Sequence, residues 1–394
     1  MVKVLIDNDK IDIFFQPIVS IKDKKIFAYE ALTRAYDDND ELISPMYLFD
    51  QAKKENISNI LDNYVRKLAI EKFQKYYNQN KNVLLFLNFE SSIIDNYLED
   101  NFLKVVHNNN INPSNIVIEI KEDSVKDNQA LIRFVNKYRE YGFIIAIDDF
   151  GTGYSSFDRL SLIKPDIVKI DRSIIYDINK NFVNSEILKA ISNMCHKIGA
   201  IVLAEGVESK NEILSCMKKD IDIFQGFYFT KAKKIVDDKI KNNIFSSINN
   251  IGDNYKTMVK NHINVKSSLL QESQTLTKNV LSILNSNTKN YIKNMENIIL
   301  ENKKLEAIYI IDFYTGLQFN DTIILIEENT LFNPTKDSHD HSLKEYYFIA
   351  KESSRGDYLS GKYISKASGN MCRTYSSGIV LNEKKYIICL DILE

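Results

Sequence analysis

Between residues 13 and 230 the sequence alternates short apolar runs with longer amphipathic stretches, and this alternation restricts the fold more than any other feature. The runs are rich in β-branched and aromatic residues and are apolar on both faces, which is typical of strands buried under helices. They are IFFQPIV (13–19), KIFAYE (25–30), NVLLFLN (82–88), NIVIEI (115–120), FIIAID (143–148), DIVKI (166–170), AIVLAE (200–205) and DIFQGF (222–227). About eight strands alternating with helices predict a closed, TIM-like (β/α)8 barrel of the α/β class.

The first two runs are joined by the short turn IKDKK, which is too short for a crossover and therefore predicts a hairpin with one antiparallel strand. Amphipathic patterns predict the intervening helices. One helix begins at Pro45 with Ser44 as its N-cap, because proline is favoured at the first helical position. The others are expected at 60–77, 128–141, 183–198 and 210–217.

The remainder of the chain has a different organisation. From about residue 236 to 305 the strand signals stop and apolar residues recur every three or four positions, which indicates long amphipathic helices. Strand patterns return from residue 306 around one helical segment, DHSLKEYYFIAKES (340–353), and predict a small α+β domain. We therefore expect a barrel domain over 1–240, a helical linker over 241–305 and a regulatory domain over 306–394.

Composition excludes several classes of protein. The 394 residues are 44% hydrophobic and 26% charged, as in ordinary globular domains. Lys and Arg (51) nearly balance Asp and Glu (53), so binding to a nucleic acid polymer through its backbone charge is not expected. The N-terminus lacks a secretory signal pattern, and no apolar run approaches the roughly 20 residues that span a bilayer. We expect a soluble, cytoplasmic protein without membrane contact.

Polar side chains stand at or near the C-terminal ends of seven of the predicted strands. They are Glu30, Asn88, Glu119, Asp148 with Asp149, Lys169, Glu205 and Gln225. In a barrel these strand ends converge on one mouth, where five carboxylates would repel one another unless a cation were present. Oxygen-rich ligands suit Mg²⁺ or Mn²⁺ and not zinc. A single carboxylate after a strand is more often a helix N-cap, so the residues alone leave the metal site and simple capping both open.

Eight short segments occur in an order that resembles the EAL-domain family of cyclic di-GMP phosphodiesterases over about residues 1–235. The segments are QPIVS (16–20), YEALTR (29–34), LNFESS (87–92), IEIKE (118–122), IDDFGTGYSS (147–156), KPDIVKID (164–171), AEGVES (204–209) and QGFYF (225–229). Two positions depart from the usual family pattern: Phe89-Glu90 replaces Leu-Ser after Asn88, and Ala232 stands near a common proline. Neither departure changes a residue that the resemblance marks as a metal ligand.

The resemblance implies a role for each matching residue. It implies that one metal is bound by Glu30, Asn88, Glu119 and Asp148, and that Asp149 is a ligand of a second cation. Lys169 matches the lysine beside the attacking water, and Glu205 matches an essential glutamate that acts as general base or metal ligand. Gln225 matches a glutamine that helps to hold the site, and the resemblance places it with Gln16 and Arg34 on the substrate side. Glu122 and the loop containing Gly151 and Gly153 match elements that link metal occupancy to dimerisation.

The activity implied by the resemblance is hydrolysis of cyclic di-GMP to linear pGpG by a homodimer that uses Mg²⁺ or Mn²⁺ in a two-metal site. Two alternatives stay open: a receptor that binds cyclic di-GMP with little catalysis, and a scaffold that works through its long helices. The C-terminal segment is similar, with less specificity, to PAS-like or Cache-like sensor domains. It is therefore expected to regulate the barrel and to bind an unknown small ligand.

Overall fold

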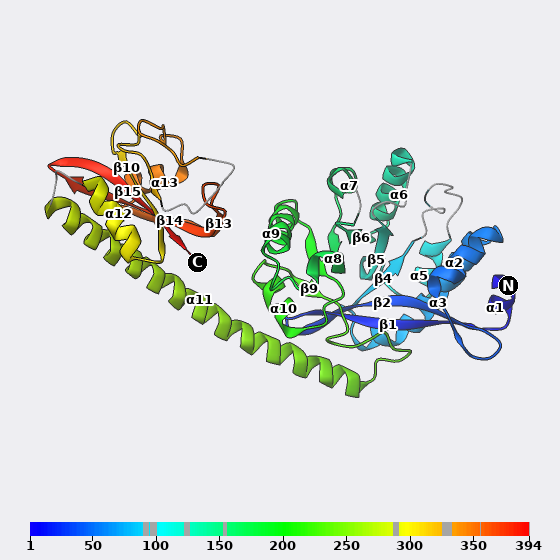
Figure 1. Cartoon of the computed structure of the whole chain (residues 1–394). Helices are drawn as coiled ribbons and strands as arrows, with labels where there is room; N and C mark the ends of the chain where they lie inside the picture. The colour runs from blue at the N-terminus through cyan, green and yellow to red at the C-terminus, as the bar shows by residue number, and fades with distance from the viewer. Residues whose placement is uncertain are drawn as a thin grey trace. The chain divides into compact units, whose positions relative to one another are not determined.

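The computed structural model describes residues 1–89, 94, 101–121, 127–152, 156–286, 291–324, 333–354 and 356–393. The chain forms two compact units, Met1–Met258 and Val259–Glu394. The first unit contains the strands that the sequence predicts for a barrel, and the second contains a smaller sheet (Figure 1).

Within the described part of the first unit, eight strands close into a barrel in which each pairs with two neighbours. In order around the ring they are β1 (Ile11–Ser20), β2 (Lys25–Tyr36), β4 (Leu84–Asn88), β5 (Ile116–Lys121), β6 (Ile144–Phe150), β7 (Ile167–Ile170), β8 (Ile201–Ala204) and β9 (Ile223–Phe224). Strand β1 is antiparallel to both β2 and β9, and the other pairs around the ring are parallel. The predicted barrel with one antiparallel strand is confirmed. A short strand, β3 (Leu42–Ile43), extends the sheet beside β2.

Helices follow most strands, and all the predicted ones are present within a few residues of their expected ends. The described helices of this unit, excluding the long helix that leaves it, are α1 (Val2–Asp7), α2 (Pro45–Lys54), α3 (Ser58–Gln79), α5 (Phe102–Asn108), η1 (Pro113–Asn115), α6 (Asn128–Glu140), α7 (Ser156–Ile163), α8 (Arg172–Ile175), α9 (Phe182–Lys197) and α10 (Lys210–Met217). Capping side chains fix several starts. Ser209 and Glu212 form a reciprocal capping box at α10, whereas Ser44 stands at the predicted N-cap of α2 without a side-chain capping bond.

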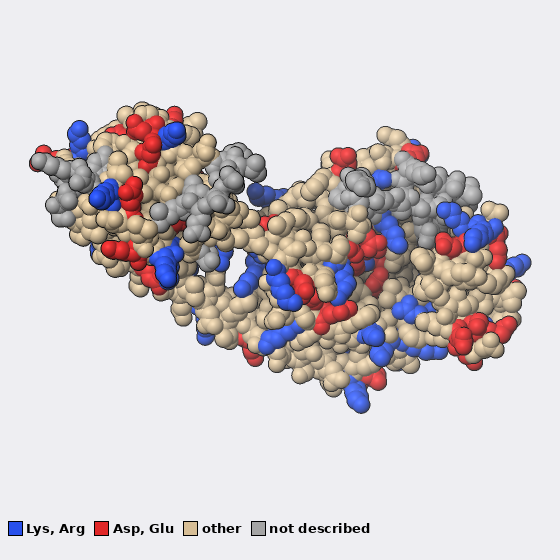
Figure 2. Space-filling model, viewed as in Figure 1, with Lys and Arg blue, Asp and Glu red and all other residues tan. Residues whose placement is uncertain are grey.

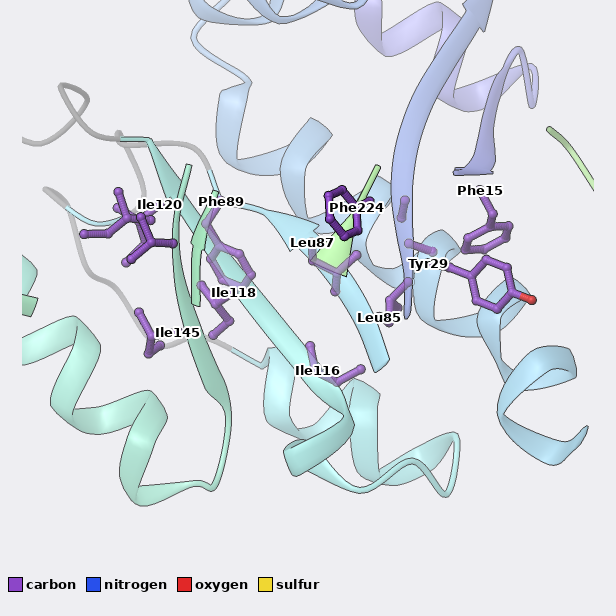
Figure 3. Packing of buried hydrophobic residues seen from close by; sticks show 14 of the residues in the cluster. Phe15, Tyr29, Leu85, Leu87, Phe89, Ile116, Ile118, Ile120, Ile145 and Phe224 are labelled. Atoms are coloured by element: carbon purple, nitrogen blue, oxygen red, sulfur yellow. The ribbon is translucent and has the colours of Figure 1, made fainter. Parts of the chain in front are cut away.

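The core of the barrel unit has two layers, because successive strand residues point to opposite faces. One layer lies between strands and helices and includes Leu85, Leu87, Ile116 and Ile118, which Figure 3 shows on neighbouring strands. The other lies inside the barrel and consists of Ile18, Ala28, Phe86, Val117, Ala146, Ile167, Leu203 and Ile223. Each interior residue is two positions from a residue predicted for the site. The interior layer therefore forms the floor on which those polar residues stand.

Helix α11 (Asp238–Ser286) begins in the first unit and continues into the second. Its residues Ile244, Ile248 and Ile251 are buried in the barrel core, which explains why the first unit extends past residue 240 to Met258. The predicted domain limits at 240 and 305 stay predictions. No helix of the described residues is both long enough and apolar enough to cross a membrane.

The second unit contains an antiparallel sheet of six strands among its described residues, so the predicted small α+β architecture is present. Its elements are α12 (Tyr291–Glu301), β10 (Leu305–Asp312), β11 (Ile323–Ile324), α13 (Glu345–Glu352), β12 (Asp357–Leu359), β13 (Tyr363–Ile364), β14 (Met371–Leu381) and β15 (Lys384–Leu393). One cluster of sheet residues packs with α11 and α12, and another packs with α13. A relationship to PAS or Cache domains stays a prediction.

His341 is buried in the second unit and uses both ring nitrogens. Its Nε2 lies 2.8 Å from Gln318 Oε1, which can only accept, so Nε2 carries the proton; Nδ1 then accepts from the Tyr346 hydroxyl at 2.6 Å. The ring stacks on Tyr309 with centroids 5.5 Å apart. Burial, with smaller contributions from His339 and Lys344, lowers the pKa of His341 to about 4, against the opposing effect of Asp340.

Acidification is expected to weaken this unit through His341. His341 takes up its proton near pH 6.5 in the unfolded chain but only near pH 4 in the folded chain. Its contribution to the free energy of unfolding is therefore complete above about pH 6.5 and is lost as the pH falls toward 4. We expect the free energy of unfolding to fall by about 2 kcal/mol more in the wild type than in His341→Gln over this range, after allowance for solvent screening. Urea unfolding at several pH values measures this difference. Equal pH slopes for the two proteins would contradict it.

Candidate active site

The barrel brings most of the predicted polar residues to one mouth, because they occupy corresponding positions near the strand ends. Gln16 lies on β1, Glu30 and Arg34 on β2, Asn88 on β4, Glu119 on β5, Asp148 and Asp149 on β6, and Lys169 on β7; Glu205 and Gln225 directly follow β8 and β9. Strand register pairs Asn88 with Glu119 and Gln16 with Glu30. Segments far apart in the sequence therefore supply one cluster.

Lys169 is at the centre of this cluster and is only 1% exposed. Its Nζ lies 2.7 Å from Asp148 Oδ1 and 2.7 Å from Glu205 Oε1. It also forms an ion pair with Glu119, and Glu30 Oε1 is 3.7 Å away. One ammonium group thus contacts carboxylates from four other strands or strand ends.

Two side-chain amides tie the carboxylates together. Asn88 Nδ2 donates to Glu119 Oε2 at 2.9 Å and to Glu30 Oε1 at 3.3 Å. Gln225 Nε2 donates to Glu30 Oε2 at 2.5 Å and to Gln16 Oε1 at 3.4 Å, while Gln16 Nε2 donates to the Thr230 carbonyl at 3.2 Å. Glu30 is consequently held by donors from two other strand ends.

The carboxylates outnumber the cation that neutralises them. Burial raises the pKa of Glu119 well above its ordinary value and that of Glu205 to about 8, despite the opposing effect of Lys169. Burial and the neighbouring Asp148 also raise the pKa of Asp149. For Lys169, burial favours the neutral amine, but the surrounding carboxylates outweigh it and raise the pKa well above its ordinary value. The site therefore has a deficit of positive charge.

The donor set fits a hard divalent cation. Asp148, Asp149 and Glu205 each offer an oxygen, and these three atoms lie within 4.8 Å of one another. Gln225 Oε1 is buried and has no hydrogen-bond partner among the described residues. Asp149 adopts a φ of 57°, a left-handed conformation that is uncommon for a residue with a side chain and is often found at functional sites. Oxygen ligands of this kind suit Mg²⁺ or Mn²⁺.

The turn after Asp149 favours glycine at residue 151. Gly151 has a φ of 102°, and a Cβ atom built there would lie 2.5 Å from Ile174 Cδ1. The positive φ therefore favours glycine at this position, and any side chain there would also displace the end of Ile174. Gly153 and Glu122, which the sequence analysis assigns to the same coupling element, lie outside the described residues.

A cavity of about 440 Å³ adjoins the cluster and is lined by Asn88, Arg34 and Lys121 together with apolar side chains such as Met46 and Phe49. Figure 2 shows acidic side chains gathered in a recess of the barrel unit. Arg34 donates to the Thr33 carbonyl at 2.8 Å, and its guanidinium lies over Phe14 at 5.5 Å. Arg34 thus forms part of the cavity wall and not of the carboxylate cluster.

Asp62 and Arg66 also line this cavity, and sequence reasoning missed them. They are both 2% exposed and form an ion pair on α3. A sequence signal was available, because an acidic and a basic residue four positions apart interrupt the apolar positions of the helix predicted at 60–77.

A family model for the EAL domain matches residues 1–232, which is more than half of the sequence. The chain belongs to the EAL domain family. The family name is spelled out here by Glu30, Ala31 and Leu32.

Two relatives illustrate the range of the EAL family. The uncharacterized EAL-domain containing protein YkuI of Bacillus subtilis (strain 168) is 24% identical over 393 residues, covering 95% of this chain and 92% of YkuI. The probable cyclic di-GMP phosphodiesterase PdeB of Escherichia coli (strain K12) is 28% identical over 228 residues, covering 58% of this chain and 43% of PdeB. The chain thus matches less than half the length of that phosphodiesterase.

Solved structures show the same fold. The crystal structure of Bacillus subtilis YkuI with cyclic di-GMP and calcium has a TM-score of 0.83 at 22% identity, and the match covers 100% of this chain and 98% of that one. The manganese and cyclic di-GMP complex of Klebsiella pneumoniae BlrP1 at pH 9.0 has a TM-score of 0.52 at 25% identity, covering 57% and 56%. The likeness to YkuI extends over both units.

Proposed function

We propose that this EAL domain protein hydrolyses cyclic di-GMP to linear pGpG with the help of divalent cations. The observation that supports this most is the placement of Lys169 among Glu30, Glu119, Asp148 and Glu205 at the mouth of the barrel. The relative PdeB is named as a probable cyclic di-GMP phosphodiesterase, and the YkuI and BlrP1 structures contain cyclic di-GMP.

Mg²⁺ or Mn²⁺ would occupy the carboxylate cluster as two ions. Glu30, Asn88, Glu119 and Asp148 would hold one, and Asp149 with neighbouring oxygens would hold the other. Bound divalent cations would neutralise charge on the phosphoryl oxygens and make water a stronger nucleophile. This role fits the deficit of positive charge around Lys169.

Side chains of the protein would stabilise charge, accept the proton and contact the substrate. Lys169 supplies a fixed positive charge beside the attacked phosphate, which stabilises the charge that develops there. Glu205 accepts a proton from the attacking water, the bond from phosphorus to the 3′ oxygen breaks, and that oxygen leaves as a hydroxyl after taking up a proton. Gln16, Arg34 and Gln225 would contact the dinucleotide, and the adjoining cavity would receive apolar base surface.

The test is incubation of the purified full chain with cyclic di-GMP and Mn²⁺ or Mg²⁺, with chromatographic detection of pGpG. Linear pGpG as the product supports the proposal. No product with either ion across a range of pH would contradict it. Tight binding of cyclic di-GMP without turnover would indicate the receptor function instead.

Glu205→Gln is expected to separate binding from catalysis. The substitution keeps the size of the side chain but removes proton acceptance, so turnover should fall by about 10² to 10⁴ while cyclic di-GMP affinity changes only a few-fold. Single-turnover rates and isothermal titration measure the two effects. Glu186→Gln, which changes a carboxylate that pairs with Lys219 on the helical side, serves as the control. An unchanged rate for Glu205→Gln would exclude Glu205 as the base.

We also propose that the protein works as a homodimer and that its second unit regulates turnover by binding a small ligand. The support is the resemblance of the loop at 148–156 and of the C-terminal segment to known regulatory elements. Light scattering of the full chain at several concentrations tests the dimer. A single monomeric species at all of them would contradict it.

A further inference from the structure

We infer that Arg66 is a positioning residue that holds the proposed metal ligand Asn88 in place through the ring of Phe89. The inference rests on the proposed function in one respect, because it takes Asn88 as a ligand. It concerns residues of α3 that lie outside the carboxylate cluster.

Arg66 is fixed within α3 by two acidic or polar neighbours. Its Nε lies 2.5 Å from Asp62 Oδ2, and its Nη2 donates to Asn63 Oδ1 at 2.8 Å. Asp62 and Arg66 are both 2% exposed. A buried ion pair usually adds little net stability compared with apolar residues of the same size, so stability alone gives little reason for this pair.

The flat guanidinium group of Arg66 covers the ring of Phe89. Its central carbon lies 4.2 Å from the centroid of Phe89 and 5.0 Å from that of Phe102. Phe89 also makes edge-to-face contacts with Phe102, Phe134 and Tyr138 at 5.5 to 5.7 Å. A planar cation over an aromatic face favours one ring orientation, which an aliphatic neighbour would not do.

Phe89 transmits this constraint to Asn88, because it is the next residue in the chain. The Phe89 amide donates to the Glu119 carbonyl at 3.1 Å, and the Asn88 side chain donates to Glu119 Oε2 at 2.9 Å. The end of β4 is thus held to β5 by main chain and side chain, and Phe89 packs against rings of α5 and α6. Outer residues of this kind commonly change metal affinity by 10- to 100-fold.

The experiment has two readouts that do not depend on turnover. Mn²⁺ affinity is measured by electron paramagnetic resonance, and the stability of the fold is measured as the melting temperature. Arg66→Met removes the charge and the planar group, and Phe89→Leu removes the ring but leaves the Asp62–Arg66 pair. We expect each to weaken Mn²⁺ binding about tenfold, and the double variant to be little weaker than either single variant, because both act through one contact.

Phe143→Leu is the matched control. Phe143 belongs to the same aromatic cluster, 5.2 Å from Tyr138 and 5.6 Å from Phe102, but it does not adjoin a proposed ligand. It should lower the melting temperature as much as Phe89→Leu while leaving Mn²⁺ affinity within twofold of the wild type. This difference separates positioning from a general loss of packing.

The outcomes distinguish the two proposals. Wild-type Mn²⁺ affinity in folded Phe89→Leu, or an equal loss in Phe143→Leu, would overturn the role of Arg66. If Arg66→Met does not fold, Phe89→Leu decides. A wild type that binds Mn²⁺ but forms no pGpG contradicts the proposed function alone, whereas a wild type that binds no Mn²⁺ contradicts both.

Discussion

Replacing Glu30 with alanine is expected to lower the rate of cyclic di-GMP hydrolysis by on the order of 10³-fold or more, the largest loss among the single carboxylates of the site. Glu30 is unusual because the side chains of three other residues contact it. Its Oε2 accepts from Gln225 at 2.5 Å, and its Oε1 accepts from Asn88 at 3.3 Å and lies 3.7 Å from Lys169. Alanine removes a proposed ligand and, with it, the acceptor that the Asn88 and Gln225 amides share.

The same contacts predict how the loss divides between binding and chemistry. Asn88 keeps its bond to Glu119, so the fold of β4 and β5 should survive, and the melting temperature should change little. Mn²⁺ affinity should fall together with the rate, and added Mn²⁺ should restore only part of it. Glu140→Ala, which changes an exposed carboxylate at the end of α6, should leave both unchanged. Activity above a tenth of the wild-type rate in Glu30→Ala would remove Glu30 from the proposed ligand set.

The fold could be predicted from the sequence because the barrel follows from patterns that repeat. Strands that are apolar on both faces must be buried on both faces, by helices outside and by other strands inside the barrel. The polar residue near the end of each strand then meets the others at one mouth of the barrel. Residues such as Phe86 and Asn88 show the rule directly: they are two positions apart on β4, and one fills the barrel while the other enters the site. The short turn before β2 similarly predicted the antiparallel strand.

Other features depend on contacts that no periodicity encodes. The helix at 60–77 could be predicted, but the burial of Asp62 and Arg66 within it could not, because Arg66 is covered by the aromatic rings of residues 89 and 102. The extension of the barrel unit to Met258 depends on the packing of Ile244, Ile248 and Ile251 against the core. Both features arise from tertiary packing, which single-sequence patterns describe poorly.

Lys169→Met is expected to lower both the stability of the fold and the rate of hydrolysis, and divalent cations should restore only the stability. Methionine keeps much of the side-chain volume but leaves Glu119, Asp148, Glu205 and Glu30 without their shared cation. Removing one partner from a buried charge cluster typically costs about 3 to 5 kcal/mol of unfolding free energy. The remaining carboxylates then take up protons more readily, so the destabilisation of the metal-free variant should be greater at about pH 8 than at about pH 5.

Divalent cations should reverse the loss of stability but not the loss of activity. Mn²⁺ enters a cluster with one positive charge fewer, so it should raise the melting temperature of Lys169→Met more than that of the wild type. The hydrolysis rate at saturating Mn²⁺ should still be lower by about 10² to 10³-fold, because no fixed charge remains beside the attacked phosphate. Lys197→Met, at the exposed end of α9, controls for loss of a surface charge. A variant with wild-type rate in saturating Mn²⁺ would show that Lys169 only balances the charge of the carboxylates and does not act on the phosphate.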